Sequence, residues 1–124
     1  MSIELIKKIS AKKATIVIST DHGTMRVKEP VKVVGTKELT TNLRYKQGQG
    51  MQYNPKDVFE ILKPEEVFLP KTHISARYIF SKNADFFAYP NNFNHYAKHY
   101  KNTFQHGGIS LEEMIIPVVT LTSK

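Results

Sequence analysis

The chain has 124 residues, enough for one domain with a real core, because a chain of this size buries about two-thirds of its unfolded surface. It contains no cysteine, which excludes disulfides and thiolate metal sites, and it shows neither a membrane span nor a secretory leader, so we expect a cytoplasmic protein. Lysine and arginine outnumber acidic residues 18 to 11, and the formal net charge of +7 favours anionic partners such as phosphate esters or nucleic acid.

The first elements are a helix and a strand. Residues 2–13 are predicted to be helical, because Ile3, Ile6 and Ile9 form one apolar stripe. Residues 14–20 follow with a continuous apolar run around Val17, which is typical of a strand buried on both faces in a parallel sheet.

Two metal-ligating residues, Asp21 and His22, follow this predicted strand. In open α/β sheets, ligands bind outside the carboxyl ends of the strands, so this position suits a metal site. Neighbouring side chains on a strand point to opposite faces, and both can serve one site only if the chain turns, which Gly23 permits by adopting positive φ. The alternative is an ordinary polar turn.

Residues 31–34 are predicted to form a short edge strand, because Pro30 opens it. Residues 35–54 show no periodicity, and we expect an extended or poorly ordered loop. Arg44, Tyr45 and Lys46 within it combine charge and an aromatic ring, which suits a phosphate clamp or a stacking surface for a base. The alternative is a solvated loop.

The pair Asn54-Pro55 predicts a helix reaching residue 62, and two aromatic runs, 78–80 and 86–89, predict a hairpin. Residues 91–104 are predicted to be helical. His95 and His99 have the i, i+4 spacing of a two-histidine metal site on this helix, but the alternative is a packing helix. We expect both to lie outside the site.

The last notable stretch is residues 103–114. Ser110 and Glu113 form a capping-box pattern, which predicts a short helix beginning at Ser110. His106 precedes it on a Gly-Gly turn and is a candidate ligand-facing imidazole. Residues 114–121 are predicted to form an apolar strand that Pro117 confines to an edge or a bulge.

Residues 19–24 and 103–118 together, with 41–45 and 89–96, resemble the C-terminal part of a PglZ domain, a member of the alkaline phosphatase superfamily. The resemblance is closest to PorX-type response regulators, in which a receiver domain is joined to a PglZ domain. It implies an α/β fold, the C-terminal portion of a three-layer α/β/α sandwich, with residues 1–124 forming a partial domain.

The resemblance also implies a two-zinc phosphodiesterase. One zinc ion would be held by Asp21 and His22 and the other by His106, with two ions clamping the attacking and leaving oxygens at phosphorus. The implied substrates are phosphodiesters of the oligonucleotide type. The segment from Arg44 to Lys46 suits such a substrate.

The chain departs from the family pattern in one respect. The family's nucleophile, its first metal-binding aspartate and an Asp-x-x-x-His pair lie upstream of the Asp-His-Gly stretch, and this sequence has none of them. We therefore expect a fragment that is inactive alone and that binds the upstream receiver and PglZ portions of its parent protein. We also expect it to form homo-oligomers. The alternatives are a non-catalytic basic module binding nucleic acid or a signalling partner, and a structural domain without a site.

Overall fold

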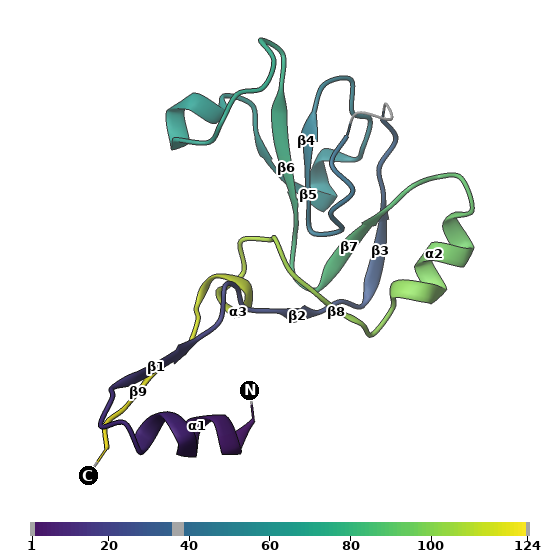
Figure 1. The fold of residues 1–124 in the computed structure, drawn as a ribbon. Coiled ribbons are helices and arrows are strands. Elements are labelled where there is room, and N and C mark those ends of the chain that lie inside the picture. The colour runs from purple at the N-terminus through teal and green to yellow at the C-terminus, as the bar shows by residue number, and fades with distance from the viewer. Residues whose placement is uncertain (1, 36–38, 124) are drawn as a thin grey trace.

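A computed structural model describes residues 2–35 and 39–123 as a mixed α/β chain with four small sheets (Figure 1). The helices are α1 (Ile3–Ser10), α2 (Phe93–Tyr100) and α3 (Leu111–Met114), together with short 3₁₀ helices at Pro55–Asp57 and Pro64–Val67. No helix in this described part of the chain is both long and apolar enough to span a membrane. The expected α/β class is confirmed.

The two ends of the chain form an arm. Strand β1 (Ile16–Ser19) pairs antiparallel with β9 (Val118–Leu121), and Figure 1 shows both strands and α1 projecting away from the remaining elements. The prediction of a parallel strand buried on both faces is wrong here, since Val17 is 63% exposed. The apolar run indicated a strand, but β9 is its one partner in the described residues and no layer covers its outer face.

The arm leads into two paired segments that place the candidate site. Strand β2 (Met25–Arg26) pairs antiparallel with β8 (Phe104–Gln105), and Met25 is opposite Gln105. The Asp-His-Gly turn lies just before β2, and His106 follows β8 directly. An antiparallel register therefore brings the two predicted ligand segments to the same end of one short ladder.

Strand β7 (Asp85–Ala88) is buried on both faces and pairs in parallel with β3 (Glu29–Lys32). Phe87 packs in one hydrophobic cluster, with Val33 and Ile79, while Phe86 packs in the other. Because successive side chains alternate across a strand, β7 joins two cores.

A three-stranded antiparallel sheet with the order β4–β6–β5 forms the rest of the fold; its strands are β4 (Tyr45–Gly48), β5 (Val58–Ile61) and β6 (Arg77–Ser81). The expected loop at 35–54 therefore contains a strand, although residues 36–38 lie outside the described part. The helix predicted over 54–62 is wrong beyond its first turn. Asn54 caps the turn at Pro55–Asp57, and the chain then pairs as β5 with β6.

The aromatic runs are strands, but the predicted hairpin is wrong. Strand β6 pairs with β4 and β5, whereas β7 pairs with β3, so the turn between them joins two different sheets. The helix expected over 91–104 is confirmed as the shorter α2, since the chain leaves helical geometry at Lys101 and enters β8.

Candidate functional site

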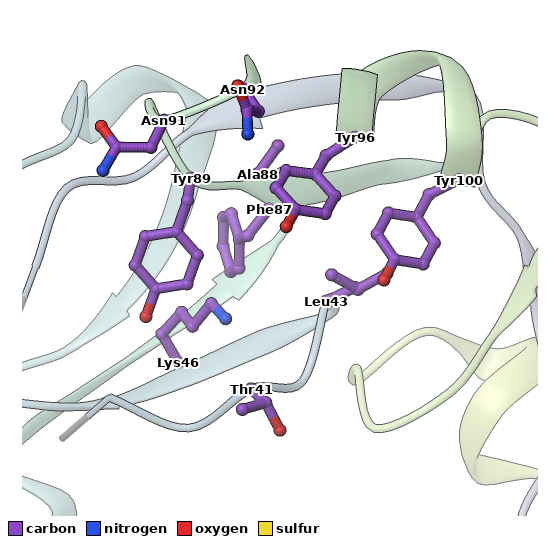
Figure 2. Close-up of a pocket in the computed structure, with 10 residues that line it drawn as sticks. All are labelled: Thr41, Leu43, Lys46, Phe87, Ala88, Tyr89, Asn91, Asn92, Tyr96 and Tyr100. Atoms are coloured by element: carbon purple, nitrogen blue, oxygen red, sulfur yellow. The ribbon is translucent and has the colours of Figure 1, made fainter. Parts of the chain in front are cut away.

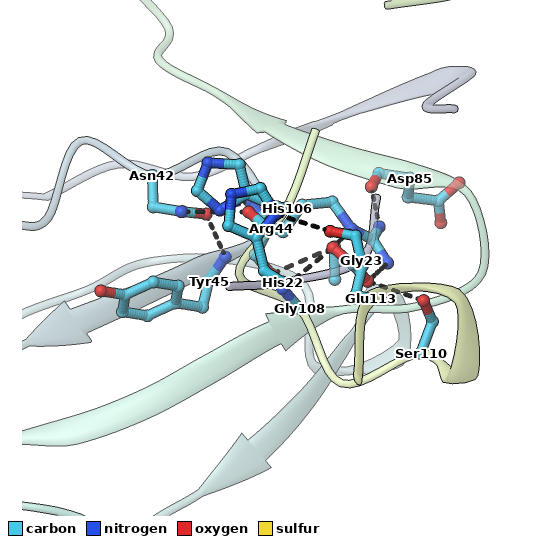
Figure 3. A network of polar contacts seen from close by, with 11 residues as sticks. His22, Gly23, Asn42, Arg44, Tyr45, Asp85, His106, Gly108, Ser110 and Glu113 are labelled. Atoms are coloured by element: carbon cyan, nitrogen blue, oxygen red, sulfur yellow. Dashed lines mark hydrogen bonds and ion pairs between the residues drawn. The ribbon is translucent and has the colours of Figure 1, made fainter. Parts of the chain in front are cut away.

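The centre of the site is a pair of stacked imidazoles. The rings of His22 and His106 lie with their centroids 3.8 Å apart and their planes at 11° (Figure 3). These residues are 84 positions apart in the sequence, and the β2–β8 ladder brings them together. The structure thus brings the two histidines predicted from the sequence to one place.

Asp21 stands at the open side of this pair. Its carboxylate Oδ1 lies 3.7 Å from His22 Nε2, and its side chain is 87% exposed. The backbone N–H of Asp21, followed by the nearby His22 ring and the Thr20 hydroxyl, lowers the pKa of this carboxyl below its ordinary value. Asp21 is therefore an ionised and accessible carboxylate at neutral pH.

Gly23 fixes the turn that presents His22. Its N–H donates to the Glu113 carbonyl at 2.9 Å, and a Cβ at this position would collide with the Glu112 carbonyl. The positive φ expected at Gly23 is wrong, because Gly23 is not among the residues of positive φ in the described part of the chain. Close approach of two backbones, and not a left-handed turn, requires glycine here.

The His106 turn rests on a buried ion pair that the sequence did not reveal. Arg44 donates from Nε and Nη2 to the two carboxylate oxygens of Glu113, both at 2.8 Å, and each side chain is 1% exposed. The third guanidinium nitrogen, Nη1, donates to the Asp85 carbonyl. A two-point pair of this kind fixes orientation as well as distance.

Glu113 also gathers the turn that follows His106. It accepts a hydrogen bond from the Gly108 N–H at 2.9 Å and one from the Ser110 hydroxyl at 2.8 Å. Burial alone would raise the pKa of Glu113, but the Arg44 guanidinium, Ser110 and Gly108 together hold it below the ordinary value. The Glu113 carboxylate of the capping-box pattern thus connects the turn after His106 to Arg44, since it accepts hydrogen bonds from both Gly108 and Arg44.

Asn42 links this network to His106. Its side-chain amide donates to the His106 carbonyl at 3.1 Å, while its Oδ1 accepts from the N–H groups of Arg44 and Tyr45 at 2.7 and 3.2 Å. Asn42, Arg44 and Glu113 are thus the positioning residues that sequence reasoning missed. The one sequence signal near them was the capping-box spacing of Ser110 and Glu113. That spacing does not indicate that the Glu113 carboxylate pairs with Arg44.

The three residues predicted to contact substrate lie in different environments. Arg44 is buried and engaged with Glu113, which corrects the expectation that it lies in an exposed loop. Tyr45 is half-buried beside Tyr78 and Phe80. Lys46 is 2% exposed and contributes to a cavity (Figure 2).

The other histidine pair lies on α2. The rings of His95 and His99 are 6.1 Å apart and contact Tyr96 and Tyr100 edge-on. These contacts fit the alternative of an aromatic packing helix.

The site residues fit zinc as a partial ligand set. The Nδ1 atom of His22 lies 2.9 Å from the Gly23 carbonyl, so a neutral ring that donates there leaves Nε2 free to ligate. The 3.7 Å from Nε2 to the Asp21 carboxylate is close to the ~3.3 Å between two ligand atoms on tetrahedral zinc. Within residues 2–35 and 39–123, however, no three His, Asp or Glu side chains are grouped to hold a metal ion.

Comparison with known proteins adds the family. A comparison with curated proteins finds no significant match. Residues 2–121 match the family model described as the BREX system PglZ alkaline phosphatase-like domain. Because this match covers nearly the whole chain, including both histidine segments, the chain belongs to the PglZ family of alkaline phosphatase-like domains.

Proposed function

We propose that this chain carries part of the metal site of a zinc-dependent phosphodiesterase, in a PglZ domain of the kind found in PorX-type response regulators. The observation that carries the proposal is the stacked pair His22–His106 with Asp21 beside it. The in-plane lone pairs of two rings inclined by only 11° do not converge on one ion. They suit two ions roughly 4 Å apart, the spacing of two-metal phosphoesterase sites.

Each side chain then has a distinct role. Asp21 and His22 hold one zinc ion and His106 holds the other, while Arg44 and Glu113 keep the His106 turn in place. Bound zinc supplies Lewis-acid activation of the attacking and leaving oxygens at phosphorus. A catalytic zinc normally has three protein ligands, so we infer that the remaining ligands and the nucleophile come from polypeptide outside this sequence.

The substrate class follows from charge. A net charge of +7 attracts polyanions, and oligonucleotide-type phosphodiesters combine that charge with a scissile bond suited to two metal ions. The same charge favours the second candidate, a basic module that binds nucleic acid or a signalling partner without catalysis.

Hydrolysis of bis-p-nitrophenyl phosphate separates these functions. We expect the 124-residue chain alone to show no turnover beyond that of free zinc. The natural protein that contains these residues should show zinc-dependent turnover, which EDTA or His106→Ala removes and His95→Ala leaves intact. Oligonucleotide binding that falls with salt but ignores EDTA and His106→Ala, without turnover in the natural protein, would establish the binding module instead.

A further inference from the structure

A second candidate site is a cavity whose lining includes neither His22 nor His106. A cavity of about 390 Å³ opens between β7, α2 and the segment before β4 (Figure 2). We call it the tyrosine pocket, and it is lined mainly by Tyr89, Tyr96, Tyr100, Phe87, Leu43 and Lys46. Its size lies within the range of small-molecule sites, and its walls are aromatic with a few polar groups, as such sites require.

The charged group of the tyrosine pocket is Lys46. Its Nζ donates to the Thr40 carbonyl at 2.7 Å and lies 5.1 Å from the centre of the Tyr89 ring. Neither partner is a carboxylate. Burial lowers the pKa of Lys46 to about 8, so the ammonium is still largely protonated at neutral pH. An ammonium has three N–H donors, and a carbonyl oxygen on a bound ligand would satisfy one that the protein does not.

The walls of the pocket suit a flat ring. Figure 2 shows the Tyr89 ring on one side and the Tyr96 and Tyr100 rings on the other. Tyr96 and Tyr100 are themselves nearly parallel, at 13° and 6.2 Å. Asn92 begins α2 in a left-handed conformation without a side-chain capping bond, so its amide is available at the rim. Stacking on aromatic side chains and hydrogen bonds from amides are how proteins hold unpaired bases.

The tyrosine pocket and the histidine pair share one segment of chain. Thr41 and Leu43 line the pocket, while Asn42 between them contacts the His106 carbonyl. The pocket and the His106 turn are therefore connected through residues 41–43.

We propose that the tyrosine pocket binds a nucleobase carrying a ring carbonyl, such as a 6-oxopurine, from the nucleotide adjoining the scissile phosphodiester. This assignment rests on the proposed function for the identity of the substrate. The base stacks against the tyrosine rings, and Lys46 donates to the carbonyl oxygen. Lysine contacts to the O6 and N7 acceptors of guanine are among the commonest base-specific interactions.

The test compares inosine 5′-monophosphate with adenosine 5′-monophosphate, which carry the same phosphate and differ at position 6 of the base. Both are titrated into the full 124-residue chain in EDTA, and binding is followed by NMR of the backbone amides. We expect inosine monophosphate to bind about tenfold more tightly, the effect of one well-placed base contact. The shifts should centre on Tyr89, Lys46 and Asn92.

Variants locate the binding. Tyr96→Ala should weaken both nucleotides at least several-fold, and its partly exposed position leaves the core intact. Lys46→Met should remove the preference for inosine monophosphate, whereas Lys98→Met, on the exposed side of the same helix as Tyr96, should change nothing. Equal affinity for the two nucleotides, full competition by inorganic phosphate, or insensitivity to Tyr96→Ala would overturn the assignment.

The experiments distinguish a failure of the base-binding proposal from a failure of the proposed phosphodiesterase function. Because the titration contains no metal, base binding without zinc-dependent hydrolysis in the natural protein would remove the phosphodiesterase and leave the pocket. Hydrolysis of bis-p-nitrophenyl phosphate by the natural protein, without preference for inosine monophosphate, would remove only the pocket.

Discussion

Arg44 and Glu113 lie 69 residues apart in the sequence and form a two-point ion pair with both N–O distances at 2.8 Å. Both side chains are 1% exposed. Through Gly108 and Ser110, this pair fixes the turn that carries His106, and through the Glu113 carbonyl it fixes the turn that carries His22. The histidine pair therefore depends on an interaction between two buried side chains.

Glu113→Gln tests this dependence. The substitution leaves a buried guanidinium without its counter-charge, and breaking one partner of a buried pair costs about 3–5 kcal/mol of unfolding free energy. The loss is measured by urea denaturation. Glu112→Gln, on the exposed neighbouring residue, is the matched control and should stay within about 0.5 kcal/mol. Equal effects from the two substitutions would contradict the role of the pair.

Acid sensitivity should follow from the same carboxylate. The pKa of Glu113 is lowered in the folded state, so its contribution to stability is complete above the pKa of the unfolded chain. It is lost as the pH falls from the unfolded value through the lower folded value, because in this window the unfolded chain binds a proton that the folded protein does not. The unfolding free energy of Glu113→Gln should lack this component below about pH 4.5.

Lys46 predicts a second rise of stability with pH, in the alkaline range. Burial lowers its pKa from 10.5 to about 8, so between these values the unfolded chain binds more protons than the folded one. Stability should therefore rise with pH through this window, by up to about 3 kcal/mol. Lys46→Met removes the titrating group, so the unfolding free energy of the wild type should rise relative to that of the variant from pH 8 to 10. A constant difference would show that Lys46 keeps its ordinary pKa.

Gly23→Ala should separate the two histidines. A methyl group there meets the Glu112 carbonyl, and relieving such a collision costs about 1–3 kcal/mol and moves the backbone. The stacked rings shift each other's NMR signals, and these ring-current shifts should disappear in the variant. Thr24→Ala, at the next and exposed position, is the control and should preserve them.

Several features of this protein were predictable from residue type alone. Asp21 and His22 stand out because they follow an apolar run and precede a glycine, and His106 stands out because it precedes a Gly-Gly turn and a helix start. The pairing of β2 with β8, which brings them together, was not predictable, because two-residue strands leave no periodic signal. Tertiary pairing also overrode local preference at β5, where a helix start at Asn54-Pro55 gives way to pairing with β6.

The solvent exposure of individual side chains was also not predictable from the sequence. Arg44 and Lys46 were predicted to lie in an extended or poorly ordered loop, yet both are buried. Their partners, Glu113 and the Thr40 carbonyl, are identified only once the chain has folded. Conversely, Val17 was predicted to be buried and is exposed, because burial depends on which elements cover a strand.

The arm formed by α1, β1 and β9 is the part of the protein that we expect to mediate self-association. Val17, Val118 and Ile3 are all more than 60% exposed, and β1 has one paired edge in the described residues. Such an edge with apolar side chains favours pairing with another chain. Sedimentation velocity should show a dimer or larger species, which Val17→Lys shifts toward monomer. Phe68→Lys, at a side chain that is 98% exposed but away from the arm, should leave the distribution unchanged.

The most direct test of the central claim is a zinc titration of the chain labelled with ¹⁵N at its histidine rings. At about pH 7.5, where protons compete weakly for imidazole, the signals of His22 and His106 should move together, with lower affinity than at a four-ligand zinc site. Asp21→Asn should weaken the response, and His73 should not respond. Shifts confined to His95 and His99, or no shift at His22 and His106, would contradict the assignment of a metal site to this pair.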